Sequence, residues 1–428
     1  MVNLEKGSSK LLNAWAFYDW ANSVYTLVIA STIFPIYYGA IFRSKGVEEI
    51  QLFGFLIRSE ALIPYVTAIG FLLIAIISPL LSGIADYLGN KKFFLKLFCY
   101  IGSISCMSLY FFSLDNLILS LVVYLLALIG YWGSLVFYNS YLPDIAHIGQ
   151  QDKISAKGYS LGYAGSVILL LICLVLVLFI KGYELQMMKI SFVLVGIWWM
   201  GFSQYTYKYL PDTKNGNKLH KNIILNGFRE LLKVWKQIKQ INPLKRYLSA
   251  FFVYSMAVQT IMIIAAYFGE KEVQWGSDDY RTIGLIISIL VIQIVAIFGA
   301  LLTSKLVSKY GNIKVLILLN FLWILICIYA YFVITPTDFY IAAFFVGLVM
   351  GGIQSLSRST YSKFIPAETT DTTSFFSFYD VSEKIGIVIG MFTYGFIADI
   401  TGKIQNAILF LILFFVVGLL LLLRVPKN

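Results

Sequence analysis

The chain has 428 residues, of which 59% are hydrophobic, and a mean hydropathy of +0.80. These values exclude an ordinary soluble enzyme. The formal net charge of +11 would suit a nucleic-acid partner, but Lys and Arg gather in alternate polar loops. That pattern fixes membrane topology, so we expect no nucleic-acid binding. The cysteines lie in apolar runs without CxxC spacing, so we expect no disulfide framework, metal site or cofactor.

Apolar runs of about 20 residues, the length that crosses a bilayer, recur along the whole chain. They predict an all-α polytopic membrane protein with twelve transmembrane helices. The even number and the basic loops place both termini in the cytoplasm. The predicted spans are 12–40, 61–83, 93–113, 117–141, 160–180, 188–208, 247–268, 282–304, 315–334, 339–361, 375–398 and 404–424.

The first span contains an aspartate, Asp19, and an ionisable residue inside a membrane helix marks a functional site by default. Asn22, Ser23 and Thr26 follow at helical spacing and Tyr25 flanks them, which predicts a polar face turned from lipid. Asp19 is therefore expected to bind a substrate ammonium or to carry a proton. The alternative is structural, with Asp19 hydrogen-bonded so that span 1 is held against span 5 or span 11.

The loop between spans 2 and 3 carries Gly83, Asp86, Gly89, Lys91 and Lys92. Gly83 permits close helix approach, Gly89 permits a positive φ, and Asp86 suits the N-terminus of a neighbouring helix. The two lysines favour the cytoplasmic side. The spacing resembles the loop signature of the major facilitator superfamily, which implies a transporter.

The loop after span 4 contains His147 and Asp152, at a spacing found in some acyltransferases. No associated domain accompanies the pair, so a membrane acyltransferase is kept only as an alternative. Span 5 then opens with Gly158 and Gly162, a small-xxx-small pair that predicts a close helix crossing.

Residues 209–246 interrupt the spans with a strongly basic segment. Ile224, Phe228, Leu231 and Trp235 recur there at helical spacing. This segment predicts an amphipathic helix on the inner membrane face, within a linker that joins an N-terminal bundle, 1–208, to a C-terminal bundle, 247–428.

The second bundle echoes the first. Gly89 and Gly311 are each followed by Asn and lie 222 residues apart, and Pro143 and Pro366 lie 223 apart. Two unrelated motifs with nearly one offset predict two six-helix pseudo-repeats, with the substrate near the midplane between them.

Three glutamines, Gln259, Gln293 and Gln354, lie within predicted spans and are candidate cavity groups or interhelical contacts. In span 11, Asp380 and Lys384 form an i, i+4 pair, whereas Glu383 has no local partner.

We expect an inner gate in which Arg358 meets Glu383 or Asp380, and Asp86 meets the N-terminus of span 11. Such contacts would break when the cytoplasmic mouth opens. A static salt bridge within the membrane is the alternative.

Four stretches sharpen the resemblance: 18–23 (YDWANS), 138–146 (YNSYLPDIA), 155–165 (SAKGYSLGYAG) and 354–359 (QSLSRS). They resemble one branch of the superfamily, the bacterial unknown major facilitators and the fungal autophagy-related vacuolar effluxers. The resemblance implies a twelve-span secondary transporter and, from the fungal members, amino-acid export.

Together these observations predict a monomeric transporter in a bacterial inner membrane. It is expected to move a small solute by alternating access, either coupled to protons or as a uniporter or exporter, with the lipid bilayer as its surroundings. A transporter-like receptor or scaffold that signals through 209–246 is the other alternative.

Overall fold

The computed structural model describes residues 4–426 except 53 and 213–222. Its long elements are α-helices, and a short β-hairpin joins α2 to α3. The predicted linker lies partly outside the described residues, at 213–222. The elements are α1 (Ser9–Asn22), the π-helix η1 (Tyr25–Ala30), α2 (Ile33–Lys45), β1 (Glu49–Leu52), β2 (Phe55–Arg58), α3 (Ser59–Leu88), α4 (Lys91–Ser108), the 3-10 helix η2 (Leu109–Phe111), α5 (Leu117–Asn139), α6 (Leu142–Ile145), α7 (Ile148–Phe179), α8 (Glu184–Tyr209), α9 (Ile223–Gln240), α10 (Asn242–Glu272), α11 (Asp278–Tyr310), α12 (Asn312–Ala330), α13 (Pro336–Phe364), α14 (Thr372–Thr401) and α15 (Ile404–Leu422).

The fold class predicted from hydropathy is confirmed. Twelve helices of the described residues are long and apolar enough to cross a membrane. Two details differ from the prediction. Span 5 begins at Ile148 rather than at 160, because polar residues continue the helix beyond the apolar run. Span 1 consists of α1, η1 and α2 in succession rather than one α-helix.

Two hydrophobic cores form, one from residues between Leu11 and Leu210 and one mainly from residues between Val234 and Val425. Glycines set the closest helix contacts in each. A Cβ at Gly130 of α5 would meet the backbone of Gly102 on α4, and a Cβ at Gly351 of α13 would meet the backbone of Ala296 on α11. Small residues at such crossings are typical of membrane bundles.

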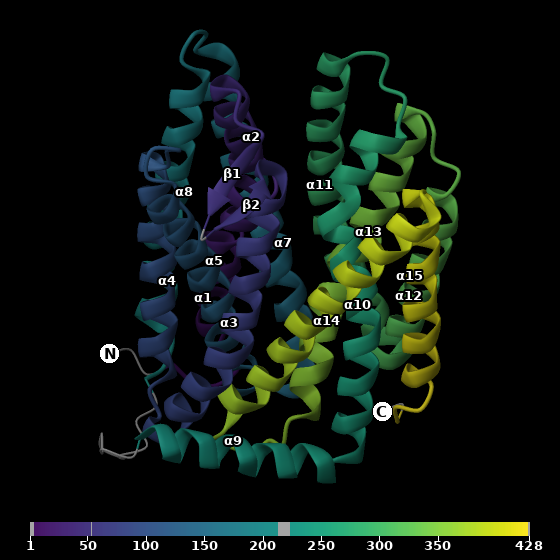
Figure 1. Cartoon of the computed structure of the whole chain (residues 1–428). Coiled ribbons are helices and arrows are strands. Elements are labelled where there is room, and N and C mark those ends of the chain that lie inside the picture. Colours follow the sequence, from purple (N-terminus) through teal and green to yellow (C-terminus); the bar gives the residue numbers. More distant parts are fainter. Residues whose placement is uncertain (1–3, 53, 213–222, 427–428) are drawn as a thin grey trace.

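The two bundles stand side by side and diverge away from the end that carries both termini (Figure 1). At the terminal end, α3 of the first bundle approaches α14 of the second, and α9 crosses beneath both. Helix α7 also packs against α11 and α13. We call this end, where the loops after α3, α5 and α13 meet, the closed end.

Candidate functional site

Asp19 lies on α1 and is buried where three helices meet. Its Oδ2 accepts a hydrogen bond from the Tyr138 hydroxyl of α5 at 2.8 Å and lies 3.1 Å from Arg358 Nη2 of α13. The prediction that a hydrogen bond of Asp19 holds span 1 against span 5 or span 11 is therefore wrong. The partners of Asp19 lie on span 4, in α5, and on span 10, in α13. The ion pair joins the first bundle to the second.

Arg358 is held on all sides by the first bundle. Its Nε donates to Ser155 Oγ at 2.9 Å, its Nη2 to the Ser155 carbonyl at 3.0 Å, and its Nη1 to Asn139 Oδ1 at 3.2 Å. The guanidinium also lies over the rings of Trp15 and Tyr159, 4.8 and 4.3 Å from their centroids. Only 2% of Arg358 is exposed. A buried cation with this many partners holds the bundles in one relative position.

The predicted pairing of Arg358 with Glu383 or Asp380 is wrong. Arg358 turns from α13 into the first bundle and meets Asp19, whereas both acids of α14 pair with Lys384 on their own helix. The i, i+4 pair between Asp380 and Lys384 does form, with 2.9 Å between Asp380 Oδ1 and Lys384 Nζ.

A second charged cluster, which we call the α14 cluster, consists of Asp380, Glu383 and Lys384. Lys384 Nζ also lies 2.9 Å from Glu383 Oε2 and 3.8 Å from the centroid of the Trp132 ring on α5. Because Lys384 is the next residue in the chain, the expectation that Glu383 lacks a local partner is also wrong. Glu383 Oε1 in addition accepts a hydrogen bond from Gln259 Nε2 of α10 at 2.6 Å. Two carboxylates share one ammonium, which leaves one negative charge in excess when all three groups are ionised.

Within the α14 cluster, one carboxylate oxygen has no hydrogen bond to any described residue. This atom is Asp380 Oδ2, and it is buried. Glu383 is the most exposed member, with 16% of its side chain accessible, against 7% for Asp380 and 1% for Lys384. The cluster therefore has spare acceptor capacity and one partly exposed carboxylate.

Gln354 also bridges the bundles. Tyr163 of α7 donates from its hydroxyl to Gln354 Oε1 at 2.5 Å, one turn of α13 away from Arg358. Gln293 of α11 is half-buried, one turn before Ile297, whose carbonyl accepts a hydrogen bond from Ser160 of α7 at 3.2 Å. Gln259, Gln354 and Gln293 thus come from three helices of the second bundle.

Asn22 and Tyr25 belong instead to the interior of the first bundle. Asn22 is fully buried at the end of α1, and Tyr25 stacks on the ring of Tyr131 with 4.9 Å between centroids. The Tyr25 hydroxyl has no hydrogen bond to a described residue. The predicted polar face is interrupted because the π-helix η1 begins at Tyr25, and single π-turns are frequent at functional sites.

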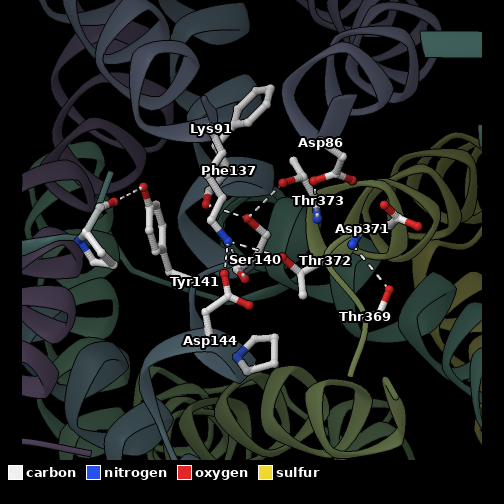
Figure 2. Close-up of polar contacts among 12 residues, drawn as sticks. Asp86, Lys91, Phe137, Ser140, Tyr141, Asp144, Thr369, Asp371, Thr372 and Thr373 are labelled. Atoms are coloured by element: carbon white, nitrogen blue, oxygen red, sulfur yellow. Dashed lines mark hydrogen bonds and ion pairs between the residues drawn. The ribbon is translucent and has the colours of Figure 1, made fainter. Parts of the chain in front are cut away.

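The Asp86 carboxylate lies at the start of α14, at the closed end. It accepts a hydrogen bond from the backbone N–H of Thr373 at 3.2 Å (Figure 2). It accepts a second one from the backbone N–H of Ser374 at 2.6 Å. These N–H groups lie in the first turn of α14, where an anion also interacts favourably with the helix dipole. Gly89 ends α3 with a φ of 64°, as the tight turn requires.

Lys91 connects the same loop to both bundles. It pairs with Asp144, donates to the Ser140 carbonyl at 3.1 Å and to Thr372 Oγ1 of α14 at 3.1 Å, and lies 4.3 Å from the centroid of the Tyr141 ring (Figure 2).

Lys92 stays within the first half of the chain. It donates to the Leu210 carbonyl at 2.8 Å, and its Nζ lies 3.4 Å from Asp212 Oδ2. Both lysines are buried, so they contribute contacts as well as topology.

His147 and Asp152 have separate partners. The backbone N–H of His147 donates to Gln150 Oε1 at the start of α7, whereas Asp152 accepts from Asn312 at 2.8 Å and pairs with Lys363 of α13. The Asp152 side chain is thus a further link between the bundles.

Sequence reasoning missed Tyr138, Asn139, Ser155 and Tyr159 as partners of the central ion pair. A signal was present, because all four lie in the two stretches, 138–146 and 155–165, that carry the family resemblance. Trp132, beneath Lys384, had no such signal.

Comparison with known proteins supports the same fold and branch. The family model described as "Vacuole effluxer Atg22 like" matches residues 7–428. The chain is 32% identical to the "Uncharacterized MFS-type transporter YxiO" of Bacillus subtilis, over 99% of this chain and 96% of that protein. It is 21% identical to autophagy-related protein 22 of Pichia angusta, over 94% and 89% of the two chains.

Among solved structures, the fucose:proton symporter FucP of E. coli superposes with a TM-score of 0.69 at 17% identity, over 98% of both chains. A bacterial homologue of the iron transporter ferroportin, in an outward-facing state, superposes with a TM-score of 0.66 at 10% identity, over 97% of this chain and 98% of that one. At these identities the likeness concerns the fold alone. The resemblance inferred from the sequence is confirmed: this chain belongs to the vacuole effluxer Atg22-like family of major facilitator transporters.

Proposed function

We propose that this transporter exports a small solute, an amino acid or a similar metabolite, by alternating access and in exchange for protons. The ion pair between Asp19 and Arg358 carries the proposal, because it joins two bundles that must separate for the closed end to open. The description of the family as vacuole effluxers supports export, and it is the family, rather than the geometry, that suggests amino acids.

In this proposal Asp19 and Arg358 are gate residues rather than the substrate site. Asp86 and Lys91 act with them, since both contact the first residues of α14. The links between Asp152 and Lys363 and between Gln354 and Tyr163 open in the same movement. Because several polar contacts join the two bundles along the same interface, they form and break together, and the closed state is a distinct conformation.

The α14 cluster is the proposed site for the solute and the proton. Its excess negative charge is costly inside a membrane and is removed when one cation binds. A proton on Glu383 and the ammonium of an amino acid each supply that charge, so they compete for one carboxylate. When the solute ammonium pairs with Glu383, Lys384 is released from that carboxylate and can pair with the solute carboxylate. Gln259, which is bonded to Glu383, offers an amide beside it.

The closed end is proposed to face the cytoplasm of a bacterial cell, because the loops there are basic and carry both termini. The protein then works as a monomer in the inner membrane, with its solute released on the opposite side. Asn22, Tyr25 and Gln293 have supporting positions in this scheme, since among the described residues none of them is hydrogen-bonded to Asp19, Arg358 or the α14 cluster.

Proteoliposomes test the proposal directly. Wild-type protein should drive amino acids out of the closed-end side only when a pH gradient is imposed, and should exchange labelled for unlabelled solute without one. Glu383→Gln should remove the dependence on the gradient and weaken solute binding. Glu368→Gln makes the same chemical change on the exposed loop before α14 and should leave both activities unchanged.

Each negative result has its own meaning. Transport that is equal with and without the gradient contradicts proton coupling. Transport of metabolites but of no amino acid contradicts the solute class. Loss of gradient dependence in Glu368→Gln as well as in Glu383→Gln contradicts the assignment of the site.

A further inference from the structure

Helix α9 is packed against the first bundle although it follows that bundle in the sequence. Its buried side chains, Leu231, Val234 and Ile238, face the protein. A Cβ at Gly83 of α3 would meet the Gly227 carbonyl of α9, and a Cβ at Gly227 would meet Ile84. Both glycines are therefore needed for the close crossing of α3 and α9.

The same helix also contacts the start of α14. Lys233 Nζ lies 2.7 Å from Asp371 Oδ2, and the Trp235 ring stacks on the Phe378 ring with 5.4 Å between centroids. The hydrogen bond with Asp371 raises the pKa of Lys233, so this side chain stays charged. Asp371 lies two residues before Thr373, whose N–H bonds to Asp86. Helix α9 thus touches the two helices whose contact forms the closed end.

The remaining surface of α9 is apolar on one side and basic beside it. Five large apolar side chains are between 40% and 62% exposed: Ile224, Leu225, Phe228, Leu232 and Trp235. At 100° per residue, Arg229 and Lys236 lie next to this apolar stripe, and Lys239 lies within it with its ammonium 4.9 Å from the centroid of the Trp235 ring. Arg229, Leu232 and Lys236 line a shallow depression of about 450 Å³.

We propose that α9 is a lipid-dependent strap. Anionic phospholipid headgroups bind Arg229, Lys236 and Lys239 while the apolar stripe enters the membrane surface, and this binding holds Lys233 against Asp371 and strengthens the closed end. We call these three side chains the basic strip.

Two physical arguments select an anionic membrane surface as the occupant. The chain spans a bilayer, and α9 lies across the bundle end where the terminal loops emerge, so headgroups are adjacent to it (Figure 1). An amphipathic helix with Lys and Arg beside a Trp-, Phe- and Leu-rich face is also the pattern that binds at the interface and depends on anionic lipid. Each basic side chain near such a surface strengthens binding roughly fivefold.

The strap is tested by hydrogen–deuterium exchange of the full-length protein in nanodiscs. One set contains only neutral lipid, and another contains about a third phosphatidylglycerol. In the wild type the anionic lipid should slow exchange in 223–240 at least tenfold and should slow exchange in the first turn of α14. Equal exchange in both lipids in the wild type overturns the proposal.

Two variants distinguish the binding of lipid to α9 from the effect of that binding on α14. Arg229→Gln/Lys236→Gln/Lys239→Gln should lose the response in both segments. Lys233→Gln should keep the response in 223–240 and lose it at α14, because the contact with Asp371 is gone. A Lys233→Gln variant whose α14 still responds to the lipid overturns the strap.

The matched control is Lys305→Gln/Lys309→Gln/Lys314→Gln. These lysines are exposed at the same end of the second bundle, and their removal changes the net charge equally. This variant should respond to lipid as the wild type does. If it loses the response, general attraction of a basic protein to the membrane explains the effect, and the basic strip is overturned as a site.

Discussion

The two buried charged clusters of this molecule differ in what they connect. Asp19 and Arg358 come from different bundles, balance each other one to one, and have a hydrogen bond for each nitrogen of the guanidinium. The α14 cluster lies on one helix, has two carboxylates for one ammonium, and leaves Asp380 Oδ2 without a described partner.

The difference indicates that the two clusters have different roles. A balanced pair between bundles stabilises one relative position of the bundles, because its energy is lost when they separate. An unbalanced cluster on one helix survives that separation and changes with the cation that it holds. Charge pairs in a transporter can therefore be sorted by whether they cross the moving interface and whether their charges cancel.

The largest effect is expected from breaking the balanced pair. Arg358→Gln leaves the Asp19 carboxylate buried without its cation, at a cost of about 3–5 kcal/mol. The variant should lower the melting temperature of the purified protein more than any other change proposed here, and should reduce transport more than tenfold.

A double variant gives the control. Asp19→Asn/Arg358→Gln removes both charges and should recover part of the melting temperature, because no buried charge remains unpaired. A double variant as unstable as Arg358→Gln alone would mean that Arg358 acts through Ser155 and the aromatic rings rather than through Asp19.

A smaller effect is expected when the pair is displaced but kept. A Cβ at Gly158 would meet the Asp19 carboxylate, so Gly158→Ala should push Asp19 away from Arg358 and cost about 1–3 kcal/mol. Thermal unfolding measures the loss. Gly201→Ala on α8 has nothing within 4 Å of the new methyl group and should be neutral or slightly stabilising.

The contact at the closed end should rank next. Asp86→Asn keeps the shape of the side chain but removes the negative charge at the start of α14, at a cost of about 0.5–2 kcal/mol. Exchange of the Thr373 and Ser374 amide hydrogens should become faster. Unchanged exchange there would show that the helix end does not depend on the charge of Asp86.

The smallest effect is expected for a pair that crosses no interface. Lys45 and Asp115 lie 2.7 Å apart within the first bundle, and their side chains are 50% and 78% exposed. Asp115→Asn should change stability by at most about 1 kcal/mol and leave transport intact. A large loss of transport would contradict the idea that only charge pairs that cross the interface between the bundles matter for transport.

Much of the fold could be predicted from the sequence because membrane helices need long apolar runs. Those runs gave the twelve spans, and helix geometry gave the pair between Asp380 and Lys384, four residues apart. The start of α7 escaped prediction because its first turns are polar residues that contact α13 and α12 rather than lipid, as Asp152 does.

The site was harder to predict because partner choice is tertiary. Arg358, Glu383 and Asp380 lie close in sequence, which favoured a local pairing, yet Arg358 pairs across 339 residues with Asp19. Nothing in the local sequence orients Arg358 away from α14. Similarly, the π-helix at Tyr25 changes which residues share a face, and its turn has no sequence signature comparable to a proline or a glycine pair.

The separation between Asp19 and Arg358 has a consequence for biosynthesis. Chains grow at about 5–20 residues per second, and amino-terminal units fold first. Asp19 therefore enters the membrane roughly 20 to 70 s before its cation leaves the ribosome. Tyr138, also on the first bundle, is synthesised well before Arg358, so its hydroxyl is the first of the two partners that Asp19 can gain. Until α13 is inserted, the nascent half-protein must therefore hold the Asp19 carboxyl group without its cation, either protonated or bonded to Tyr138.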